Sequence, residues 1–585
     1  MINYIPRLRI HDVIVGFIYL APCYSLTLSS AELHRPNVVK RHSTGAMVVL
    51  CQSSASLFVI DGKTNHATKF AIDGLHTTHS KLADMAILDD EHLVIVDSKL
   101  GELLVVKLNV SDVVSNSIPI VGRAKIGHSP ANVLVNEKLA FVSSLWDRRW
   151  FVVDLSEPRD PKVCHSVDLS FSPRHQIQLN PNTILAIDGF CGRWATIDIG
   201  TGRVVRIGEF TGAHNMSGIA FDPARTHLLI PHMTLNAEKP TTQFNVHWGD
   251  VILNVVRKVS LEELLSETEI TDSFYYLGRP DTAAGDPTGI VVTQSERQLV
   301  CFSGTSEVGI SDPGGNSFDR VAVGRRPVGM ETSADESLLF VASQLDDSIA
   351  VIDVETRKLK TTIRLSEDAH SKSLALTTLQ LGEQLFFDST LSSDGWFSCH
   401  SCHTDCHSNG GLADTFGDGT TGDAKRVPSL LGVSDTGPWA WNGSMNTLKN
   451  QIHKSVRTTM RGEEISDEHA AAIEAFICSQ MPAPSVVQAR SQLNSERFAR
   501  GRQVFASSGC VDCHEPPSYT SADAYDVGFT DRTGNSTFNP PSLRGVSQRR
   551  RLLHDNRAAS VHDVLQRLGH QGADGLSPAE LKDLV

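Results

Sequence analysis

One strand-rich unit recurs along the first 370 residues and constrains the fold more than any other feature. Its clearest copy, residues 325–365, reads "RRPVGMETSADESLLFVASQLDDSIAVIDVETRKLKTTIRL", in which short apolar strands alternate with polar turns. Weaker copies include "LVIVDSKLGELLVVKL", "LAFVSSLWDRRWFVVDL" and "QLVCFSGTSEVGISD". Roughly seven units of about 40 to 60 residues have the period of propeller blades. We expect an all-β propeller over residues 35–370 with about seven blades, six or eight being the alternatives.

The last copy also resembles a known repeat. Its "VIDVETRK" matches the Val-Ile-Asp-x-x-Thr-x-Lys sequence of the YVTN-type β-propeller repeat, and the other copies match it less closely. The resemblance implies a fold and little about function, because propellers serve many unrelated functions. Separate blades would leave their sheet edges open, so we expect the ring to close.

Two Cys-x-x-Cys-His motifs follow the repeats. The stretch "FSCHSCHTDCH" at residues 397–407 holds Cys399, Cys402 and His403, and "CVDCH" repeats the spacing. This spacing is typical of c-type haem, with two thioether bonds and an axial histidine on the iron. The alternative is one zinc ion held by both cysteine pairs, although their separation is far longer than usual. The second motif consists of Cys510, Cys513 and His514. Cys406 and His407 lie just after the first motif without fitting its spacing, and we expect them to lie near the haem without binding it.

The part of the chain with these motifs is duplicated. "LGEQLFFDSTLSSDGWFSCHSCH" and "RGRQVFASSGCVDCH" each place an amphipathic helix before a motif. A Pro-Ser-Leu block follows each motif, and Trp441 lies 441 − 428 = 13 residues after Pro428. In the second copy His554 lies 554 − 541 = 13 residues after Pro541. We expect two mainly α, cytochrome c-like modules at residues 375–485 and 490–585, with two covalent c-type haems.

These segments resemble the bacterial di-haem cytochrome c peroxidase family, which includes the di-haem enzyme that matures methylamine dehydrogenase. The resemblance rests on "LGEQLFFDSTLS…SCHSCH", "RVPSLLGV…WNG", "GRQVFASSGCVDCH" and "PPSLRGV…HDNRA". It implies electron transfer from a C-terminal haem to a peroxide-reducing N-terminal haem, with Trp441 as the relay and Gln451 as the pocket glutamine. A buried aromatic that fills the haem pocket is the alternative role for Trp441.

The chain departs from the family at two sites. Thr459 and Met460 stand where the family has a Glu-Met dipeptide, whose glutamate is the acid/base for O–O cleavage. Peroxidase activity therefore does not follow from the resemblance. Lys425 and Arg426 replace an Arg-Asn pair whose asparagine helps to bind calcium between the modules, which argues against calcium here.

Distal ligands would decide which iron is open to substrate. At the second haem, Leu568 occupies the place of the family's Met or Tyr ligand, so His570 is the candidate, with an exposed loop histidine as the alternative. At the first haem, Met460 is the first candidate and His453 the second, because Gly419 replaces the family's distal histidine. Met460 could equally be a helix-packing residue.

Two further groups of residues have a plain and a specific interpretation. The run Arg549, Arg550 and Arg551 suits either a solvated surface or contacts with haem propionates or an acidic partner. Four histidines near the middle of the propeller suit turns and blade edges, although two of them, His232 and His247, could face the haem part. The other two are His214 and His227.

The N-terminus predicts export. Residues 1–31 have basic residues before an apolar stretch and small residues near Ala31, as a signal peptide does, with a strand of the first domain as the alternative. "LAPC" at Cys23 only faintly resembles a lipoprotein box. No later stretch has the 18 or more apolar residues of a membrane span. Because c-type haem is normally attached outside the cytoplasm, we expect a periplasmic protein.

The overall hypothesis is an exported di-haem oxidoreductase that resembles cytochrome c peroxidase. A formal charge of −14 argues against nucleic acid and suits a basic redox partner. The expected partners are an electron-donor protein, a small cytochrome or a cupredoxin, and hydrogen peroxide or a small organic or protein substrate. The alternatives are a di-haem oxidase or electron carrier without peroxidase activity, and a propeller-based redox sensor or scaffold.

Overall fold

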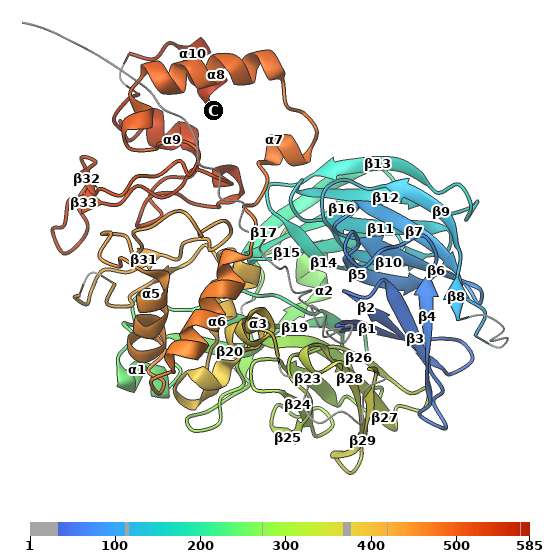
Figure 1. The fold of residues 1–585 in the computed structure, drawn as a ribbon. Coiled ribbons are helices and arrows are strands. Elements are labelled where there is room, and N and C mark those ends of the chain that lie inside the picture. Colours follow the sequence, from blue (N-terminus) through green and yellow to red (C-terminus); the bar gives the residue numbers. More distant parts are fainter. Residues whose placement is uncertain (1–32, 111–115, 272, 367–375, 418, 574) are drawn as a thin grey trace, which may run out of the picture.

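The computed structural model describes residues 33–110, 116–271, 273–366, 376–417, 419–573 and 575–585 (Figure 1). The predicted signal peptide at residues 1–31 lies outside these residues. Sheets whose strands are antiparallel except for one pair account for most of the chain up to residue 364, and mainly helical structure follows from residue 378. The predicted fold class, a propeller followed by a mainly α part, is therefore confirmed. No helix in the described ranges is long and apolar enough to span a membrane.

The first part is built from short strands of which most are apolar and buried. Two short helices, α1 (Gln243–His247) and α2 (Leu261–Leu265), lie among them. The strands are β1 (Pro36–Arg41), β2 (Met47–Cys51), β3 (Ser56–Ile60), β4 (Ala67–Ile72), β5 (Leu82–Ile87), β6 (His92–Asp97), β7 (Glu102–Lys107), β8 (Ser117–Ile118), β9 (Ile120–Lys125), β10 (Pro130–Asn136), β11 (Leu139–Ser144), β12 (Arg149–Asp154), β13 (Lys162–Asp168), β14 (Pro173–Asn180), β15 (Thr183–Asp188), β16 (Cys191–Asp198), β17 (Arg203–His214), β18 (Ala220–Phe221), β19 (His227–Leu235), β20 (Ile252–Ser260), β21 (Phe274–Tyr276), β22 (Pro287–Val292), β23 (Gln298–Phe302), β24 (Glu307–Ser311), β25 (Phe318–Ala322), β26 (Pro327–Thr332), β27 (Leu338–Ser343), β28 (Ser348–Asp353) and β29 (Lys358–Arg364).

These strands form seven blades. Five blades are separate sheets, in the orders β1-β2-β3-β4-β8, β5-β6-β7-β9, β10-β11-β12-β13, β22-β23-β24-β25 and β26-β27-β28-β29. In the first of them β8 pairs in parallel with β4 at the outer edge. The fourth blade, β14 to β17, and the fifth, β18 to β21, share one eight-stranded sheet because the end of β17 pairs with β19. The sequence-based number of blades agrees with this arrangement.

The ring closes through packing between the last blade and the first. Each pair of neighbouring blades buries an apolar layer, and one such layer joins Val49 and Phe58 of the first blade to Phe340 and Val351 of the last. The sheets are covered on both faces, so their middle strands are continuous apolar runs instead of alternating ones. The four antiparallel strands of the first blade, β1 to β4, all come from the N-terminal end of the propeller, so packing between blades closes the ring.

A buried carboxylate also fastens the two ends of the ring. Asp347, in the last blade, accepts hydrogen bonds from the backbone nitrogens of His34 at 2.9 Å and Arg35 at 2.7 Å. We expect Asp347→Asn to lower the free energy of unfolding by about 1–3 kcal/mol, because one of these backbone N–H groups then loses its charged acceptor. Urea unfolding followed by tryptophan fluorescence measures the change. Asp61→Asn is the matched control, since Asp61 accepts two backbone bonds within its own exposed turn.

The second part consists of two similar modules. In the first, α3 packs on α6, and in the second, α8 packs on α10. Each crossing depends on one glycine: a Cβ on Gly382 would lie 1.8 Å from the carbonyl oxygen of Ala472, and one on Gly501 would lie 2.2 Å from that of Asp583. The helices are α3 (Thr378–Phe386), α4 (Cys399–Cys402), α5 (Leu448–Lys454), α6 (Asp467–Cys478), α7 (Val486–Ala489), α8 (Ser495–Ser507), α9 (Val561–Gln566) and α10 (Pro578–Leu584).

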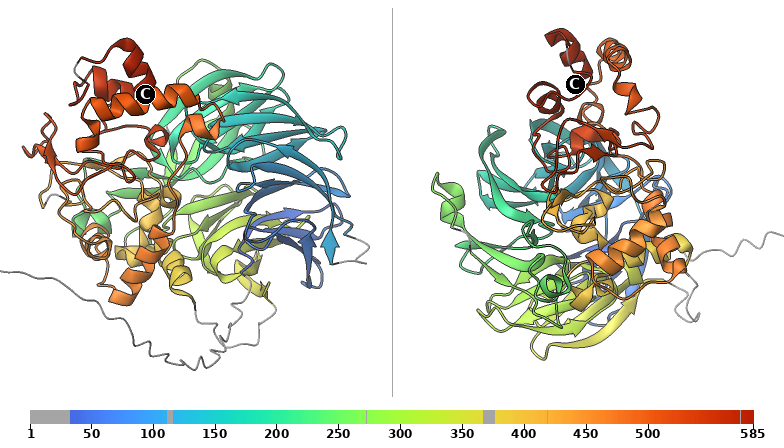
Figure 2. Two further views of the ribbon diagram at one scale, coloured as in Figure 1. Left: turned by 45° about the horizontal axis from the view of Figure 1, so that its top comes forward. Right: turned by 90° about the vertical axis from the view of Figure 1, so that its left-hand side faces the viewer.

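Short pieces between these helices repeat as well. Strands β30 (Leu412–Ala413) and β31 (Lys425–Arg426) pair in the first module, as β32 (Tyr525–Asp526) and β33 (Thr537–Phe538) do in the second. Isolated bridges join Trp439 to Met445 and Leu552 to Ala558, 113 residues apart (552 − 439). The first module lies over one face of the propeller, with contacts to opposite blades, while α8 and α10 project away from it (Figures 1 and 2).

Candidate redox site

The first Cys-x-x-Cys-His motif forms one helical turn and its histidine is held by a backbone carbonyl. Cys399 and Cys402 lie at the two ends of α4, and the His403 backbone nitrogen donates to the Cys399 carbonyl at 3.0 Å. His403 Nδ1 hydrogen-bonds to the carbonyl oxygen of Pro428 at 2.9 Å, so Nδ1 carries the proton and Nε2 has its lone pair available. Burial lowers the pKa of His403 to about 4, which keeps the imidazole neutral, the form that binds a metal.

The second motif has the same local geometry. The backbone nitrogen of His514 donates to the Cys510 carbonyl at 3.0 Å, and His514 Nδ1 hydrogen-bonds to the carbonyl oxygen of Tyr519 at 3.1 Å. Burial is again the main cause that lowers the pKa of His514 to about 4. Each histidine therefore presents Nε2 for a bond to iron next to two cysteines.

The cysteine pairs do not form a shared zinc site. Within the described ranges, just one group of three or more His, Cys, Asp or Glu side chains has its ligand atoms within 4.8 Å of one another, and it contains no cysteine. A four-cysteine zinc site would bring all four sulfurs together. The zinc alternative from the sequence is therefore wrong.

The propeller holds the first motif in place. Asp286, just before β22, accepts hydrogen bonds from the hydroxyls of Ser398 and Ser401, the latter at 2.7 Å. Asn254 Nδ2 donates to the Trp396 carbonyl at 3.0 Å. All these groups are buried, so the contact is a permanent packing interface. These pairings could not be inferred from local sequence, because the paired residues lie more than 100 positions apart.

Asp405, two residues after His403, joins the motif loop to opposite blades of the ring. Its carboxylate lies 2.5 Å from Arg174 in the fourth blade and 3.6 Å from Arg326 before the last blade. Burial alone would raise the pKa of Asp405, but Arg174, His400 and Arg326 together hold it well below its usual value. The loop is thus fixed electrostatically over the ring.

Trp441 and His554 occupy equivalent positions in the two modules and contact each other. Their ring centroids are 6.3 Å apart at an interplanar angle of 71°. His554 also stacks on Phe538 at 4.2 Å and 12°. Trp441 Nε1 donates to the carbonyl oxygen of Arg426 at 2.9 Å, and the Arg426 guanidinium lies 5.2 Å from the Trp441 ring. An aromatic path therefore crosses the boundary between the modules.

The buried polar groups near this path fit haem propionates. Burial lowers the pKa of Arg426 to about 9 and that of Arg549 to about 10. Both guanidinium groups donate hydrogen bonds to backbone carbonyl oxygens, which carry no charge. His554 Nε2 is buried without a hydrogen-bond partner among the described residues. A buried cation needs an anionic partner, and a haem carries two carboxylates. The donor set therefore matches the cofactor that the motifs imply.

The arginine run is not one solvated surface. Arg549 is half-buried, and after burial its charge is one of the causes that lower the pKa of His407 in the first module and of His514 in the second. Arg549 therefore lies close to both modules. Arg550 forms an ion pair with Glu209 of the propeller at 2.6 Å. For Arg549, contact with a haem propionate thus fits better than a position on a solvated surface.

A lysine joins the modules at the position considered for calcium. Lys425 Nζ lies 2.6 Å from Asp423 of the first module and 2.9 Å from Asp531 of the second. Burial opposes the effect, but Lys425 is among the groups that hold the pKa of Asp531 well below its usual value. The ammonium supplies the positive charge that these two carboxylates require.

The distal candidates of the first haem lie in different surroundings. Met460 is buried in an apolar cluster with Trp396 and Phe397, and Cys399 and Cys402 pack against the same cluster. His453, by contrast, pairs with Asp467 at 3.0 Å on α6. Propeller residues Met233, Val246, Val251 and Ile252 belong to the Met460 cluster as well. Of the two candidates, Met460 is the one the fold brings to the motif.

At the second haem, the loop with His570 lies against the motif. The charge of His570 is one of the causes that lower the pKa of His514. A Cβ on Gly572 would lie 3.3 Å from Cys510 Sγ. His570 Nδ1 hydrogen-bonds to the Gln571 carbonyl at 3.1 Å, so its Nε2 is available. Gln451, the remaining candidate, donates from Nε2 to Ser455 Oγ at 3.1 Å.

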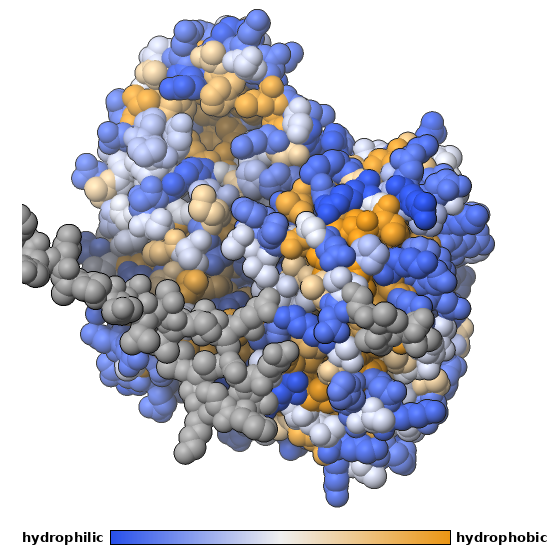
Figure 3. Space-filling view, turned by 45° about the vertical axis from the view of Figure 1, so that its right-hand side comes forward, coloured by the Kyte–Doolittle hydropathy of each residue, from blue (hydrophilic) through white to orange (hydrophobic). Residues whose placement is uncertain are grey.

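The second module also contains a hollow lined by both apolar and charged side chains. A cavity of about 480 Å³ lies between α8, α9 and α10 and is lined by Arg497, His562, Gln566, Pro578, Leu581, Lys582 and Val585. Figure 3 shows apolar side chains in a hollow of this lobe. The capping box of Ser577 and Glu580 that begins α10 is present as the sequence indicates.

Comparisons with known proteins agree with the C-terminal part. Residues 377–485 match a family model described as di-haem cytochrome c peroxidase. Cytochrome c551 peroxidase of Nitrosomonas europaea is 24% identical over 243 residues, covering 32% of this chain and 72% of that protein. Methylamine utilization protein MauG of Methylophilus methylotrophus is 22% identical over 245 residues, covering 34% and 73%. The matches support an oxidoreductase domain that uses haem.

Solved structures resemble the propeller part. Kuenenia stuttgartiensis hydrazine synthase aligns over 58% of this chain and 99% of that chain, with a TM-score of 0.48 and 18% identity. A streptogramin B lyase structure aligns over 54% of this chain and 92% of that chain, with a TM-score of 0.39 and 11% identity.

Proposed function

We propose that this chain, whose residues 377–485 match the di-haem cytochrome c peroxidase family, is an exported oxidoreductase that carries electrons between two covalent c-type haems. Cys399 and Cys402 would attach the first haem, and Cys510 and Cys513 the second. When bound, the two haems supply one-electron transfer and an iron site for a small oxidant such as hydrogen peroxide. His403 and the equivalent histidine of the second motif would be the proximal ligands.

The contact between Trp441 and His554 is the observation that carries this proposal. Each residue comes from the matching position of one module. The guanidinium of buried Arg426 lies 5.2 Å from the Trp441 ring, and the Arg426 backbone nitrogen donates to the His554 carbonyl at 2.6 Å, so one arginine that suits a propionate lies next to both residues. A chain that kept its haems apart would gain nothing from this aromatic bridge. His570 is proposed as the distal ligand of the second haem, which would then remain closed to substrate and serve electron transfer.

One observation favours a second candidate function, a di-haem oxidase or carrier without fast peroxide reduction. Thr459 lies at the end of the π-helical turn Ser455–Thr459, next to Met460, and has no carboxyl group to donate a proton. Glu463 and Glu464 are exposed in the following loop. An acid must be within hydrogen-bond reach of the reacting oxygen, so the first module lacks the usual proton donor.

The propeller would protect the first haem and present a surface to a partner. It covers the first motif through Asp286 and Asn254, and it supplies Met233 to the Met460 cluster. We propose a small cytochrome or a cupredoxin with a basic face as electron donor, because the formal charge of −14 would attract it over long range. The compartment proposed is the periplasm.

Trp441→Phe tests the proposed path. We expect electron transfer between the haems to slow by at least about tenfold, equal to about 1.4 kcal/mol in the barrier, because the indole and its bond to the Arg426 carbonyl are lost. The rate is measured by stopped-flow absorbance after reduction of one haem in the matured protein. Trp248→Phe, an exposed tryptophan outside the path, should leave the rate unchanged. An unchanged rate in Trp441→Phe would exclude this relay, and absence of covalent haem would exclude the function itself.

A further inference from the structure

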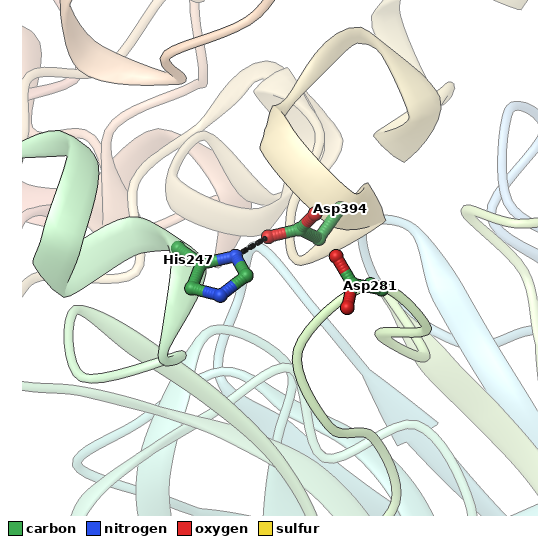
Figure 4. Close-up of side chains that lie close together, drawn as sticks. All are labelled: His247, Asp281 and Asp394. Atoms are coloured by element: carbon green, nitrogen blue, oxygen red, sulfur yellow. Dashed lines mark hydrogen bonds and ion pairs between the residues drawn. The ribbon is translucent and has the colours of Figure 1, made fainter.

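Three potential metal ligands meet where the propeller touches the first module. His247 ends α1, Asp281 follows β21, and Asp394 belongs to the short helical turn Ser393–Gly395 before the first motif. Each offers one ligand atom, and these atoms all lie within 4.8 Å of one another. Figure 4 shows the three side chains directed toward a common point, with His247 Nδ1 hydrogen-bonded to Asp394 Oδ2 at 2.8 Å.

Backbone contacts hold the three segments in register. Trp396 Nε1 donates to the carbonyl oxygen of His247 at 3.1 Å, and the backbone nitrogen of Ala283 donates to the Asp394 carbonyl at 3.2 Å. Arg320 anchors the Asp281 segment from the other side, with a hydrogen bond to the Ala283 carbonyl at 2.8 Å. The side chains therefore converge on a frame that packing has already ordered.

The charge at this position is unbalanced. Two carboxylates face one imidazole, and in the described part of the chain no Lys or Arg forms an ion pair with Asp281 or Asp394. The nearby Arg279 is directed elsewhere, since its Nε donates to Thr282 Oγ1 at 3.2 Å. A cation bound between the carboxylates would remove their mutual repulsion.

We propose that His247, Asp281 and Asp394 form a binding site for one divalent transition-metal cation of the Zn²⁺ and Mn²⁺ class. An imidazole with two carboxylates suits these borderline cations, whereas Ca²⁺ and Mg²⁺ take oxygen ligands alone. Three protein ligands leave at least one position for water, and exposed Asp281 provides the entry path. The ion would join two propeller loops to the turn that precedes the first motif. This site is independent of electron transfer between the haems.

Zinc binding to the full-length, haem-loaded, tag-free protein tests the site. We expect one Zn²⁺ per chain by titration calorimetry and metal analysis, and a loss of affinity of at least about 10–100-fold in Asp394→Asn and in Asp281→Asn. Asparagine is the suitable replacement because both residues have positive φ, 61° and 66°, which it tolerates. Asp89→Asn is the matched control: Asp89 pairs with His92 at 3.0 Å without a third ligand.

A second measurement separates a joining ion from binding at the surface. Zn²⁺ should raise the midpoint of thermal unfolding of the wild type and of Asp89→Asn, but not that of Asp394→Asn, and excess Ca²⁺ or Mg²⁺ should not displace it. No zinc binding at millimolar concentration, or equal binding by all three variants, would overturn the proposal. The haem absorbance spectrum should be the same in every variant, so a failure of the haem function would be recognised separately.

Discussion

Thr459→Glu is expected to raise the rate of hydrogen peroxide reduction by about 10²–10⁴-fold, the usual contribution of a well-placed general acid. The change restores a Glu-Met dipeptide at the end of the π-helical turn Ser455–Thr459. Met460, the next residue, packs in the same apolar cluster as Cys399 and Cys402, so position 459 lies close to the first motif. Steady-state oxidation of a reduced cytochrome by peroxide measures the gain.

The controls separate the carboxyl group from its size and its general neighbourhood. Thr459→Gln has nearly the same volume without an acidic proton and should show no gain. Glu463→Gln should leave the wild-type rate unchanged, because this side chain is exposed in the next loop. If Thr459→Glu alone shows no gain in the rate of peroxide reduction but the double variant Thr459→Glu, Met460→Ala does, then Met460 closes the iron to peroxide. A wild type as fast as the glutamate variant would contradict the premise that the acid is missing.

The propeller was predictable because each blade carries its own signal. Apolar strands such as Leu338–Ser343 and Ser348–Asp353 are adjacent in sequence and pair with each other, so turn positions and strand order follow from local pattern. The number of blades also followed, since each unit adds one blade. Two local irregularities have no counterpart in the repeat pattern: the long β17, which links two blades into one sheet, and β8, which pairs in parallel with β4.

The module pair was predictable from duplication, and the two glycines show why. Gly382 and Gly501 stand in "LGEQLF" and "RGRQVF", and each permits a carbonyl of the partner helix to approach where a Cβ could not fit. The quoted motifs contained both residues. Their role could have been inferred from a helix that keeps a glycine at the same position in both copies.

Of the docking of the modules on the propeller, the sequence suggested no more than that His232 or His247 could face the haem part, and His247 does pair with Asp394 of the first module. The other contacts could not be predicted. Asp405 lies beside His403 in an ordinary-looking loop, yet it binds arginines that precede it by 231 (405 − 174) and 79 (405 − 326) positions. Arg549 belongs to a run that composition assigns to the surface, whereas the fold half-buries it close to His407 of the first module. Such contacts depend on how two finished domains meet, and no local periodicity records them.

Acid is expected to destabilise this protein strongly between pH 6.5 and pH 4.5. Burial lowers the pKa of His214 to about 4, and that of His232 and of His407 to about 3. The unfolded chain binds protons on these imidazoles below about pH 6.5 and the native protein does not, so the free energy of unfolding falls as pH falls. Each residue costs up to about 2–3 kcal/mol at pH 4.5. Asp84 opposes the trend, since burial raises its pKa to about 6 and it gains stability over the same range.

His232→Gln should reduce the loss of unfolding free energy at pH 4.5 by about 2–3 kcal/mol, the contribution of one buried histidine. His232 Nδ1 donates a hydrogen bond to the Met233 carbonyl at 2.9 Å, and Nε2 accepts one from Arg257 Nε at 3.1 Å. Protonation of His232 would break the second bond and place a positive imidazolium against the positive guanidinium. Glutamine can keep both bonds without titrating in this range. Urea midpoints measured from pH 7.5 to pH 4.5 should fall less in this variant than in the wild type. His92→Gln, at the half-buried first position of β6, should follow the wild type. Parallel curves for all three proteins would show that the buried histidines do not control the acid response. The pKa of the Asp405 carboxyl is lowered in the folded protein, so its contribution to the free energy of unfolding is lost only below its unfolded pKa. It therefore does not obscure the effect of the histidines between pH 6.5 and pH 4.5.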